Sequence, residues 1–181
     1  MKNDIMKRNN GITLITLAIT IIILTIIGSI TVYEGVQSIE EAKVQKCITN
    51  MLSIKSKVNG YSEEIDSKTW DKKEADSRKS AKVPLFEQNK LTVAASVDKN
   101  IFANKRPESS NFVFYNVTVE ALKNMKLEDL IEDESSNYIV VFSVSDDGTY
   151  GESDVIYTKG VKYKKQMYYT LSELQVVMDG E

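Results

Sequence analysis

A late loop of the chain gathers acidic side chains at a spacing that could bind a metal ion. Residues 145–154 contain two glycines and four carboxylates, those of Asp146, Asp147, Glu152 and Asp154. Calcium takes about six to eight oxygen ligands, often from flexible loops rich in carboxylates, so this segment predicts a calcium site. The spacing is not that of an EF-hand. An Asp-Gly turn between two strands produces the same composition without a metal, and both interpretations stay open.

Few other side chains could support catalysis. The chain has no histidine, and Cys47 is its only cysteine. An intramolecular disulfide, a Cys/His zinc site and a Cys-His nucleophile pair are therefore excluded. Glu132, Asp133 and Glu134 are consecutive and point to different faces, which indicates a surface charge run rather than an acid/base pair. The residues predict a protein that is not an enzyme.

Aromatic residues offer two candidate binding surfaces. Trp70 is the only tryptophan, and it lies in a strongly charged segment. It could be an adhesive surface residue, although a contact that holds this segment against the folded C-terminal part of the chain, the head, is the favoured interpretation. Four tyrosines could form a face for sugars or proteins, but alternation along strands predicts that some of them are buried. They are Tyr157, Tyr163, Tyr168 and Tyr169.

An uncharged apolar run dominates the N-terminal part of the chain. Residues 12–32 form 21 positions without charge, and 13 of them are Ile, Leu or Val. A helix rises 1.5 Å per residue, so this run reaches about 31 Å, close to the thickness of a hydrocarbon core of about 30 Å. Lipid offers the backbone no hydrogen-bond partner except itself. The run therefore predicts one transmembrane helix.

The charges around this run predict its orientation. The formal net charge is −3, the first eleven residues carry +2, and the remainder therefore carries −5. Positive charges before a span stay in the cytoplasm, so we expect a single-pass protein of the cytoplasmic membrane with its head outside. The acidic head has no basic footprint, and direct nucleic-acid binding is not expected. A cleavable secretory signal is disfavoured by the length of the run, whereas a plain uncleaved signal anchor fits the hydropathy equally well.

The junction between the basic leader and the apolar run is more specific. It runs Lys7-Arg8-Asn9-Asn10-Gly11-Ile12-Thr13-Leu14-Ile15-Thr16-Leu17. This segment resembles the prepilin-peptidase site of type IV pilins and type II secretion pseudopilins, in which a short basic leader ends in glycine. The resemblance implies cleavage after Gly11, methylation of Ile12 as the new N-terminus, and a stem helix that continues from Thr13.

One residue departs from the family pattern. The family carries a glutamate at the position of Thr16, and the resemblance implies that this glutamate pairs with the terminal amine of a neighbouring subunit. A charge inside the membrane is costly unless it is paired, and Thr16 cannot form that ion pair. The departure leaves cleavage in place and predicts a minor or specialised subunit.

Small and hydroxyl-bearing residues follow one side of the predicted span. Projection at 100° per residue places them in one sector, and such stripes let membrane helices approach closely. The stripe therefore predicts an assembly surface, although a run rich in isoleucine and threonine also produces one by chance. Its members are Thr13, Thr16, Thr20, Gly28 and Thr31.

Helical spacing continues beyond the predicted span. The spacing predicts an apolar stripe that faces the rest of the folded chain, with Cys47 buried on it. Its members are Val32, Val36, Ile39, Cys47, Met51, Ile54 and Val58. The Asn-Gly pair at 59–60 predicts the end of the helix. The charged segment that follows, 59–82, is then expected to be a solvated connection that has room for a short helix after Ser67.

The rest of the chain predicts a small β-rich head. Strand-like runs cover 90–97, 111–117, 138–144, 154–158 and 160–169, and a short helix capped by Thr118 covers 119–130. We expect an α+β fold in which the long N-terminal helix packs on a small antiparallel sheet, as in pilins. The expected parts are a leader (1–11), a transmembrane half-stem (12–33), an outer half-stem (34–58), a connection (59–82) and a head (83–181).

The sequence leaves two functions open. The resemblance implies a processed structural subunit of a type IV pilus-like or pseudopilus filament that serves secretion, attachment or DNA uptake. Its partners would be a prepilin peptidase, other pilin-like subunits, a membrane assembly platform and membrane lipid. The alternative is a binding module that an uncleaved signal anchor holds at the cell surface. No cofactor is expected apart from the calcium considered above.

Overall fold

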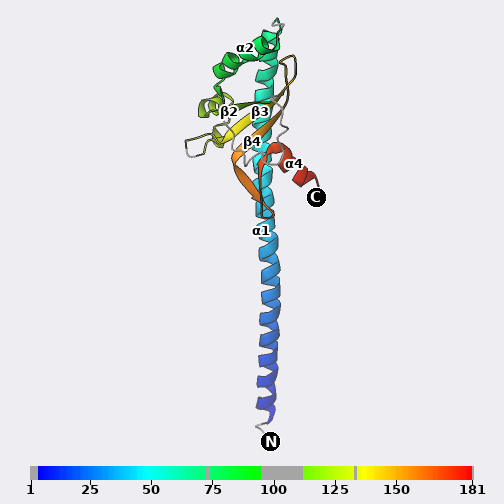
Figure 1. Cartoon of the computed structure of the whole chain (residues 1–181). Helices are drawn as coiled ribbons and strands as arrows, with labels where there is room; N and C mark the ends of the chain where they lie inside the picture. The colour runs from blue at the N-terminus through cyan, green and yellow to red at the C-terminus, as the bar shows by residue number, and fades with distance from the viewer. Residues whose placement is uncertain (1–3, 72–73, 95–111, 133, 181) are drawn as a thin grey trace. The chain divides into compact units, whose positions relative to one another are not determined.

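The computed structural model has an α+β architecture, as the sequence predicted (Figure 1). It describes the backbone of residues 4–71, 74–94, 112–132 and 134–180, and within these ranges the side chains of all except 4–16, 26–37 and 75. The chain divides into two compact units, residues 1–42 and 43–181, and each is described by itself. The elements in chain order are α1 (Asp4–Thr69), α2 (Ala75–Gln88), β1 (Leu91–Val93), β2 (Phe112–Val117), α3 (Val119–Asn124), the 3-10 helix η1 (Glu128–Leu130), β3 (Tyr138–Val144), β4 (Tyr150–Tyr163), β5 (Gln166–Thr170) and α4 (Leu171–Asp179).

The head contains one antiparallel sheet of five strands. Their order in the sheet, β1-β2-β3-β4-β5, is also their order along the chain, so each strand pairs with its sequence neighbours. The bounds of β3 agree with the prediction, and β2 agrees with it over Phe112–Val117, because Asn111 lies outside the described residues. The end of the first predicted strand, beyond Ala94, lies outside the described residues. The sequence therefore predicted the meander correctly.

The break between the last two predicted strands is in the wrong place. Gly160 does not separate two strands: β4 runs through it to Tyr163, and the turn follows at Lys164 and Lys165, whose φ angles are 45° and 69°. Gly160 has a φ of 68° and lies where the β4–β5 register shifts, which is a position typical of a β-bulge. The glycine allows a bulge here, whereas the turn uses two lysines in a conformation that usually favours Asn-Gly.

The first helix is longer than the sequence predicted. We expected it to end at Asn59-Gly60, but α1 continues to Thr69. A Cβ at Gly60 would meet nothing within 4 Å, so the fold does not require glycine there. The stripe of buried residues continues through Ser62 and Ile65. This burial outweighs the cost of about 1 kcal/mol for a glycine inside a helix.

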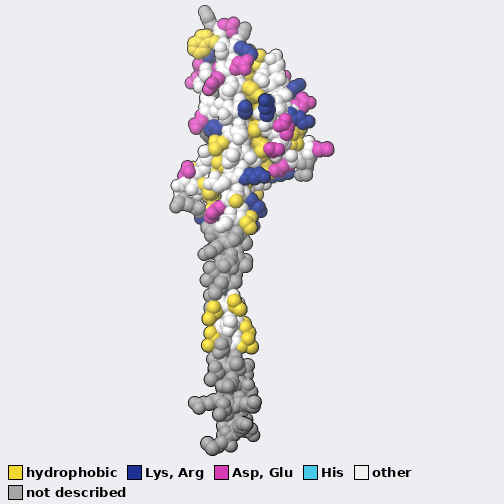
Figure 2. Space-filling view, turned by 180° about the vertical axis from the view of Figure 1, so that it is seen from behind, with side chains coloured by type: hydrophobic (Ala, Val, Ile, Leu, Met, Phe, Trp, Pro, Cys, Tyr) yellow, Lys and Arg dark blue, Asp and Glu magenta, His cyan; other side chains and the backbone are white. Residues whose placement is uncertain are grey.

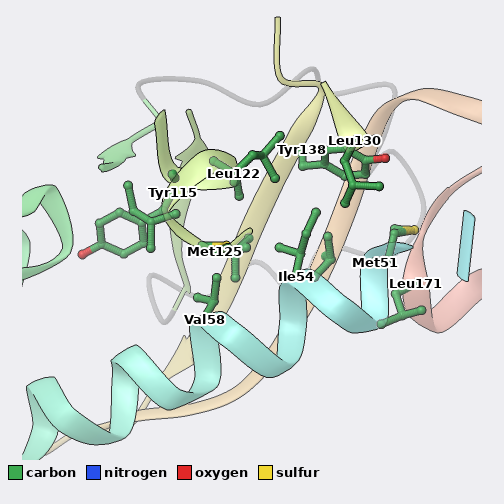
Figure 3. Packing of buried hydrophobic residues seen from close by; sticks show 14 of the residues in the cluster. Met51, Ile54, Val58, Tyr115, Leu122, Met125, Leu130, Tyr138 and Leu171 are labelled. Carbon is green, nitrogen blue, oxygen red and sulfur yellow. The ribbon is translucent and has the colours of Figure 1, made fainter. Parts of the chain in front are cut away.

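The main core forms between the second part of α1 and one face of the sheet. The predicted stripe is buried at Cys47, Met51, Ile54 and Val58, but Ile39 is exposed, which corrects the prediction there. Val32 and Val36 lie outside the described side chains. Figure 3 shows residues of α1 packed beneath residues from β2, α3 and β3, together with Leu171 of α4. The labelled members of this core are Met51, Ile54, Val58, Tyr115, Leu122, Met125, Leu130, Tyr138 and Leu171.

The opposite face of the sheet carries a smaller apolar cluster. Ile139, Val141 and Ile156 are buried there, and Phe112 and Phe114 pack against them. Because β3 is covered on both faces, its sequence is an almost continuous apolar run instead of an alternating one.

Two helices occupy most of the connection that we predicted at 59–82. The final turns of α1 and the start of α2 are helical, so a loop over this whole range is wrong, whereas the short helix expected after Ser67 is present as α2. The helix α2 contains Pro84, and its residue Phe86 is fully buried against the sheet. The buried residues of α2 are few and widely spaced, so its packing on the sheet was not visible in the charged sequence.

The remaining helices match the prediction in part. Thr118 caps α3 as expected, with its hydroxyl accepting a hydrogen bond of 3.1 Å from the Ala121 amide. The predicted helix 119–130 divides into α3 and η1. The C-terminal helix α4 was missed, although its capping box was visible in the sequence, because Thr170 is followed three residues later by Glu173.

Candidate functional site

The predicted processing and assembly residues all lie on α1. Its backbone is helical through Gly11, Ile12, Thr13, Thr16, Thr20, Gly28 and Thr31. Of these residues, only Thr20 has a described side chain, and it is exposed. The predicted stripe therefore lies almost entirely outside the described side chains.

The described part of the N-terminal unit presents large aliphatic side chains to its surroundings. In the stretch 17–25 every residue is exposed, and Figure 2 shows the hydrophobic side chains of this region as a band. The large ones are Leu17, Ile19, Ile21, Ile22, Ile23 and Leu24, between 49% and 64% exposed. Among the residues that the structure describes, no helix has an apolar stretch long enough to cross a membrane. The rest of the apolar run of residues 12–32 lies outside the described side chains.

A threonine of this segment satisfies its hydroxyl inside the helix. Thr25 Oγ1 donates a hydrogen bond of 2.7 Å to the carbonyl oxygen of Ile21, one turn earlier. This is the usual way in which a hydroxyl is accommodated where water is absent. The polar side chain at position 25 is therefore compatible with an apolar environment.

The four carboxylates of the predicted calcium site are not gathered in the structure. The loop between β3 and β4 is a tight turn in which the Gly148 amide donates to the Ser145 carbonyl oxygen at 2.9 Å. Asp154 instead accepts hydrogen bonds from the hydroxyl and the amide of Ser172, at 2.7 and 3.3 Å, which holds the start of α4. No group of three or more acidic or cysteine side chains in the described residues could hold a metal ion, and all four predicted ligands are among these residues. The loop has the geometry of a hairpin turn, and calcium binding stays a prediction.

Asp147 has a structural partner in this turn. Its carboxylate accepts hydrogen bonds from the amide of Thr149 at 3.0 Å and from the Thr149 hydroxyl at 2.8 Å. Arg78 of α2 lies 3.2 Å from the same carboxylate. These hydrogen bonds from Thr149, followed by the charge of Arg78, hold the pKa of Asp147 below its usual value. The residue stays ionised and links the turn to α2.

Trp70 is exposed, contrary to the favoured prediction. Trp70 is the first residue after α1 and is 77% exposed, so it does not hold a loop against the head. The Arg78 guanidinium lies 5.8 Å from the centre of its ring. Arg78 also donates to Thr149 Oγ1 at 3.2 Å, which fixes the guanidinium on the β3–β4 turn. The indole ring therefore lies beside a guanidinium that the β3–β4 turn holds in place, and most of the ring is exposed to solvent.

A buried lysine that sequence reasoning missed connects three elements. Lys82 of α2 is fully buried and forms an ion pair with Asp66 of α1. Its ammonium donates to the Gly148 carbonyl oxygen at 3.0 Å and lies 4.2 Å from the centre of the Tyr150 ring. Nothing in the sequence distinguishes this lysine from its exposed neighbours in a charged segment. Its role comes only from the way in which α1, α2 and the β3–β4 turn meet.

Cys47 is a packing residue, as predicted. Its thiol is 7% exposed and lies 3.6 Å from the Met51 sulfur. Burial, followed by the nearby charge of Glu132, raises the pKa of Cys47 to about 11. The thiol is therefore protonated at physiological pH and is a poor nucleophile.

The tyrosines do not form one exposed face. Tyr163 is fully buried, whereas Tyr157, Tyr168 and Tyr169 are half-buried, as strand alternation predicted. The Tyr157 hydroxyl donates to Glu132 at 3.0 Å. Burial, followed by this hydrogen bond, raises the pKa of Tyr157. The phenol therefore remains a donor at physiological pH.

Comparison of the chain with protein-family models, with curated proteins and with solved structures found no match.

Proposed function

We propose that this chain is a structural subunit, minor or specialised, of a type IV pilus-like or pseudopilus filament. The segment around Gly11 carries the proposal, because basic residues, a glycine and an uncharged apolar run follow one another as in a prepilin-peptidase substrate. A glycine allows close approach of the backbone to a peptidase, and the basic residues keep the leader in the cytosol. The continuous helix from this segment to Thr69 supports the proposal, because a stem subunit needs such an element.

The exposed aliphatic side chains at 17–25 add a physical argument. Exposing such a surface to water costs a free energy of about 25 cal/mol for each Å² of apolar area, which favours an apolar environment for this segment. A bilayer provides it before assembly, and neighbouring stems provide it within a filament. The proposed location is the cytoplasmic membrane, with the head outside, followed by a filament.

Thr16 is the reason for proposing a minor or specialised subunit. A carboxylate at this position would need a partner within the membrane, whereas a threonine hydroxyl can bond to its own helix as Thr25 does. A subunit without the carboxylate suits a position that has no neighbouring amine to pair with. The proposed partners are a prepilin peptidase, other pilin-like subunits and an assembly platform.

We expect cleavage between Gly11 and Ile12 in cells that contain a prepilin peptidase. The leader and the glycine meet the requirements of the peptidase, whereas Thr16 lies beyond the cleaved bond. Intact-mass analysis of membrane-extracted protein would detect the loss of residues 1–11 and one added methyl group. A Gly11→Val variant is the matched control and should keep its leader. A wild-type chain that retains Met1 to Gly11 beside an active peptidase would contradict the pilin proposal.

The exposed tryptophan favours one alternative, a surface-binding module on an uncleaved anchor. Trp70 combines a large exposed ring with a fixed cation beside it. Exposed tryptophans of this kind are frequent hot spots in binding surfaces. The two functions differ in whether the leader is removed, and they also differ in their dependence on this one side chain.

If the chain acts as a binding module, Trp70→Ala should weaken its binding to purified cell envelopes by roughly thirtyfold, which corresponds to about 2 kcal/mol. The full-length chain in neutral detergent would be assayed by cosedimentation with the envelopes. Trp70→Phe should retain most of the binding because it keeps an aromatic ring. Leu52→Ala removes another exposed apolar side chain and should have no effect. Equal binding by wild type and Trp70→Ala would remove the support for this alternative.

A further inference from the structure

A small hollow lies between α1 and the sheet, on the side of the head where the chain enters the second unit. Lys43, Lys46 and Asn50 line it from α1, and Tyr138 and Tyr157 line it from the sheet. Its volume is about 270 Å³. Drug-sized ligands occupy pockets of about 300–1,000 Å³, so this hollow is suited to a smaller group.

The hollow has an excess of positive charge. Its one carboxylate, that of Glu132, accepts hydrogen bonds from the Tyr157 hydroxyl and the Lys159 ammonium, each at 3.0 Å. In the part of the chain that the structure describes, neither Lys43 nor Lys46 forms an ion pair. The two lysines are three residues apart on one helix, so their charges face the same region and repel each other. An anion between them would relieve this repulsion.

The rest of the lining includes the side chain of Asn50 and two aromatic rings, beside Cys47, Gly160 and Val161. The rings of Tyr138 and Tyr157 lie side by side, with 5.2 Å between their centres. The side chain of Asn50 lines the hollow from α1, opposite these rings on the sheet. A ligand would therefore meet two ammonium groups together with an amide and the faces or edges of two phenols. This combination matches a phosphate ester with a short hydroxylated body.

We propose that this hollow binds a small phosphate-bearing anion of about the size of glycerophosphate, held by Lys43 and Lys46. Such a group occurs in soluble phosphate esters and in the headgroups of anionic phospholipids. A lipid headgroup is one possible source because Lys43 lies only eleven residues after Val32, the end of the apolar run that is proposed to enter the membrane. The site goes beyond the proposed filament function and does not depend on it.

Equilibrium dialysis of the full-length chain in neutral detergent, with glycerol 3-phosphate as the probe, would test the site. We expect wild type to bind at millimolar concentration or better, and the double variant Lys43→Gln/Lys46→Gln to bind at least tenfold more weakly, because hydrogen bonds to charged groups are lost. Lys57→Gln/Lys79→Gln removes the same charge elsewhere in the unit and should bind like wild type. Glycerol without phosphate should not bind. Near-ultraviolet circular dichroism would verify that both double variants are folded.

A second measurement distinguishes the two sources of the phosphate. Tyr138 and Tyr157 line the same hollow, so a bound ligand should change the near-ultraviolet circular dichroism of their rings. A change in phosphatidylglycerol vesicles but not in phosphatidylcholine vesicles, and its loss in Lys43→Gln/Lys46→Gln, would identify the lipid headgroup. A change that requires added glycerol 3-phosphate in both vesicles would identify a soluble ester. If no probe changes this signal and no binding appears in dialysis, or if the two double variants bind equally, the proposal is wrong.

Discussion

Replacing Phe86 with alanine is expected to lower the free energy of unfolding of the head by about 4 kcal/mol. The ring is fully buried and stacks on Tyr115 with 4.5 Å between the ring centres. It also lies 5.6 Å from both Phe142 and Tyr150. Alanine would leave a cavity among three aromatic rings that α1 and the sheet cannot fill, so α2 would lose its main apolar contact.

Urea unfolding of the full-length chain in mild detergent, followed by near-ultraviolet circular dichroism, would measure this loss. The signal reports the packing of buried aromatic residues and is insensitive to helix that persists in the micelle. Phe86→Leu keeps most of the volume and should cost less than about 1.5 kcal/mol. Gln88→Ala changes an exposed residue of the same helix and should stay within about 0.5 kcal/mol of wild type. A loss below 1 kcal/mol for Phe86→Ala would show that α2 is not docked as described.

Lys82→Met is expected to destabilise the head by about 3 kcal/mol. The change keeps a side chain of similar length but leaves Asp66 without its buried partner and the Gly148 carbonyl oxygen without a donor. Asp66 is 28% exposed and can be hydrated in part, so the expected loss is at the lower end of the range for broken buried pairs. The same urea experiment would measure it.

Two control variants make the lysine experiment specific. Lys68→Met applies the same substitution to the Lys68–Glu64 pair, which is exposed, and should cost less than about 0.5 kcal/mol. The double variant Lys82→Met/Asp66→Asn removes both charges and should recover part of the loss, because no uncompensated charge remains. Equal losses in Lys82→Met and Lys68→Met would contradict the role given to the buried pair.

The two large effects are coupled because both residues belong to one face of α2. Lys82 and Phe86 are four residues apart, which places them one turn apart on the same side of the helix. Lys82 holds this helix to α1 and the β3–β4 turn, and Phe86 holds it to the sheet. We expect the double variant Lys82→Met/Phe86→Ala to lose less free energy of unfolding than the sum of the two single variants, because α2 can detach only once.

Local patterns in the sequence determined much of the architecture. Strand β3 was predicted at its observed bounds because a run of β-branched and aromatic residues between polar segments has few other interpretations. Cys47, Met51, Ile54 and Val58 were assigned to one helix face because a period of 3.6 residues is visible without any knowledge of the partner surface. The cap at Thr118 was also local. The proposed filament function rests on the sequence as well, through the residues around Gly11.

The tertiary structure decided what local signals could not. Gly60 and Gly160 are both good stop signals, yet a helix and a strand continue through them because burial of the residues beyond outweighs the local preference. Asp147 and Asp154, near the β3–β4 turn, have partners on α2 and α4, and the carboxylates predicted to bind calcium are not gathered in the described structure. The packing between elements also determines that Lys82 is buried and Trp70 is exposed. Neither outcome is encoded by neighbours in the sequence, because each depends on which surfaces of α1, α2 and the hairpin meet after folding.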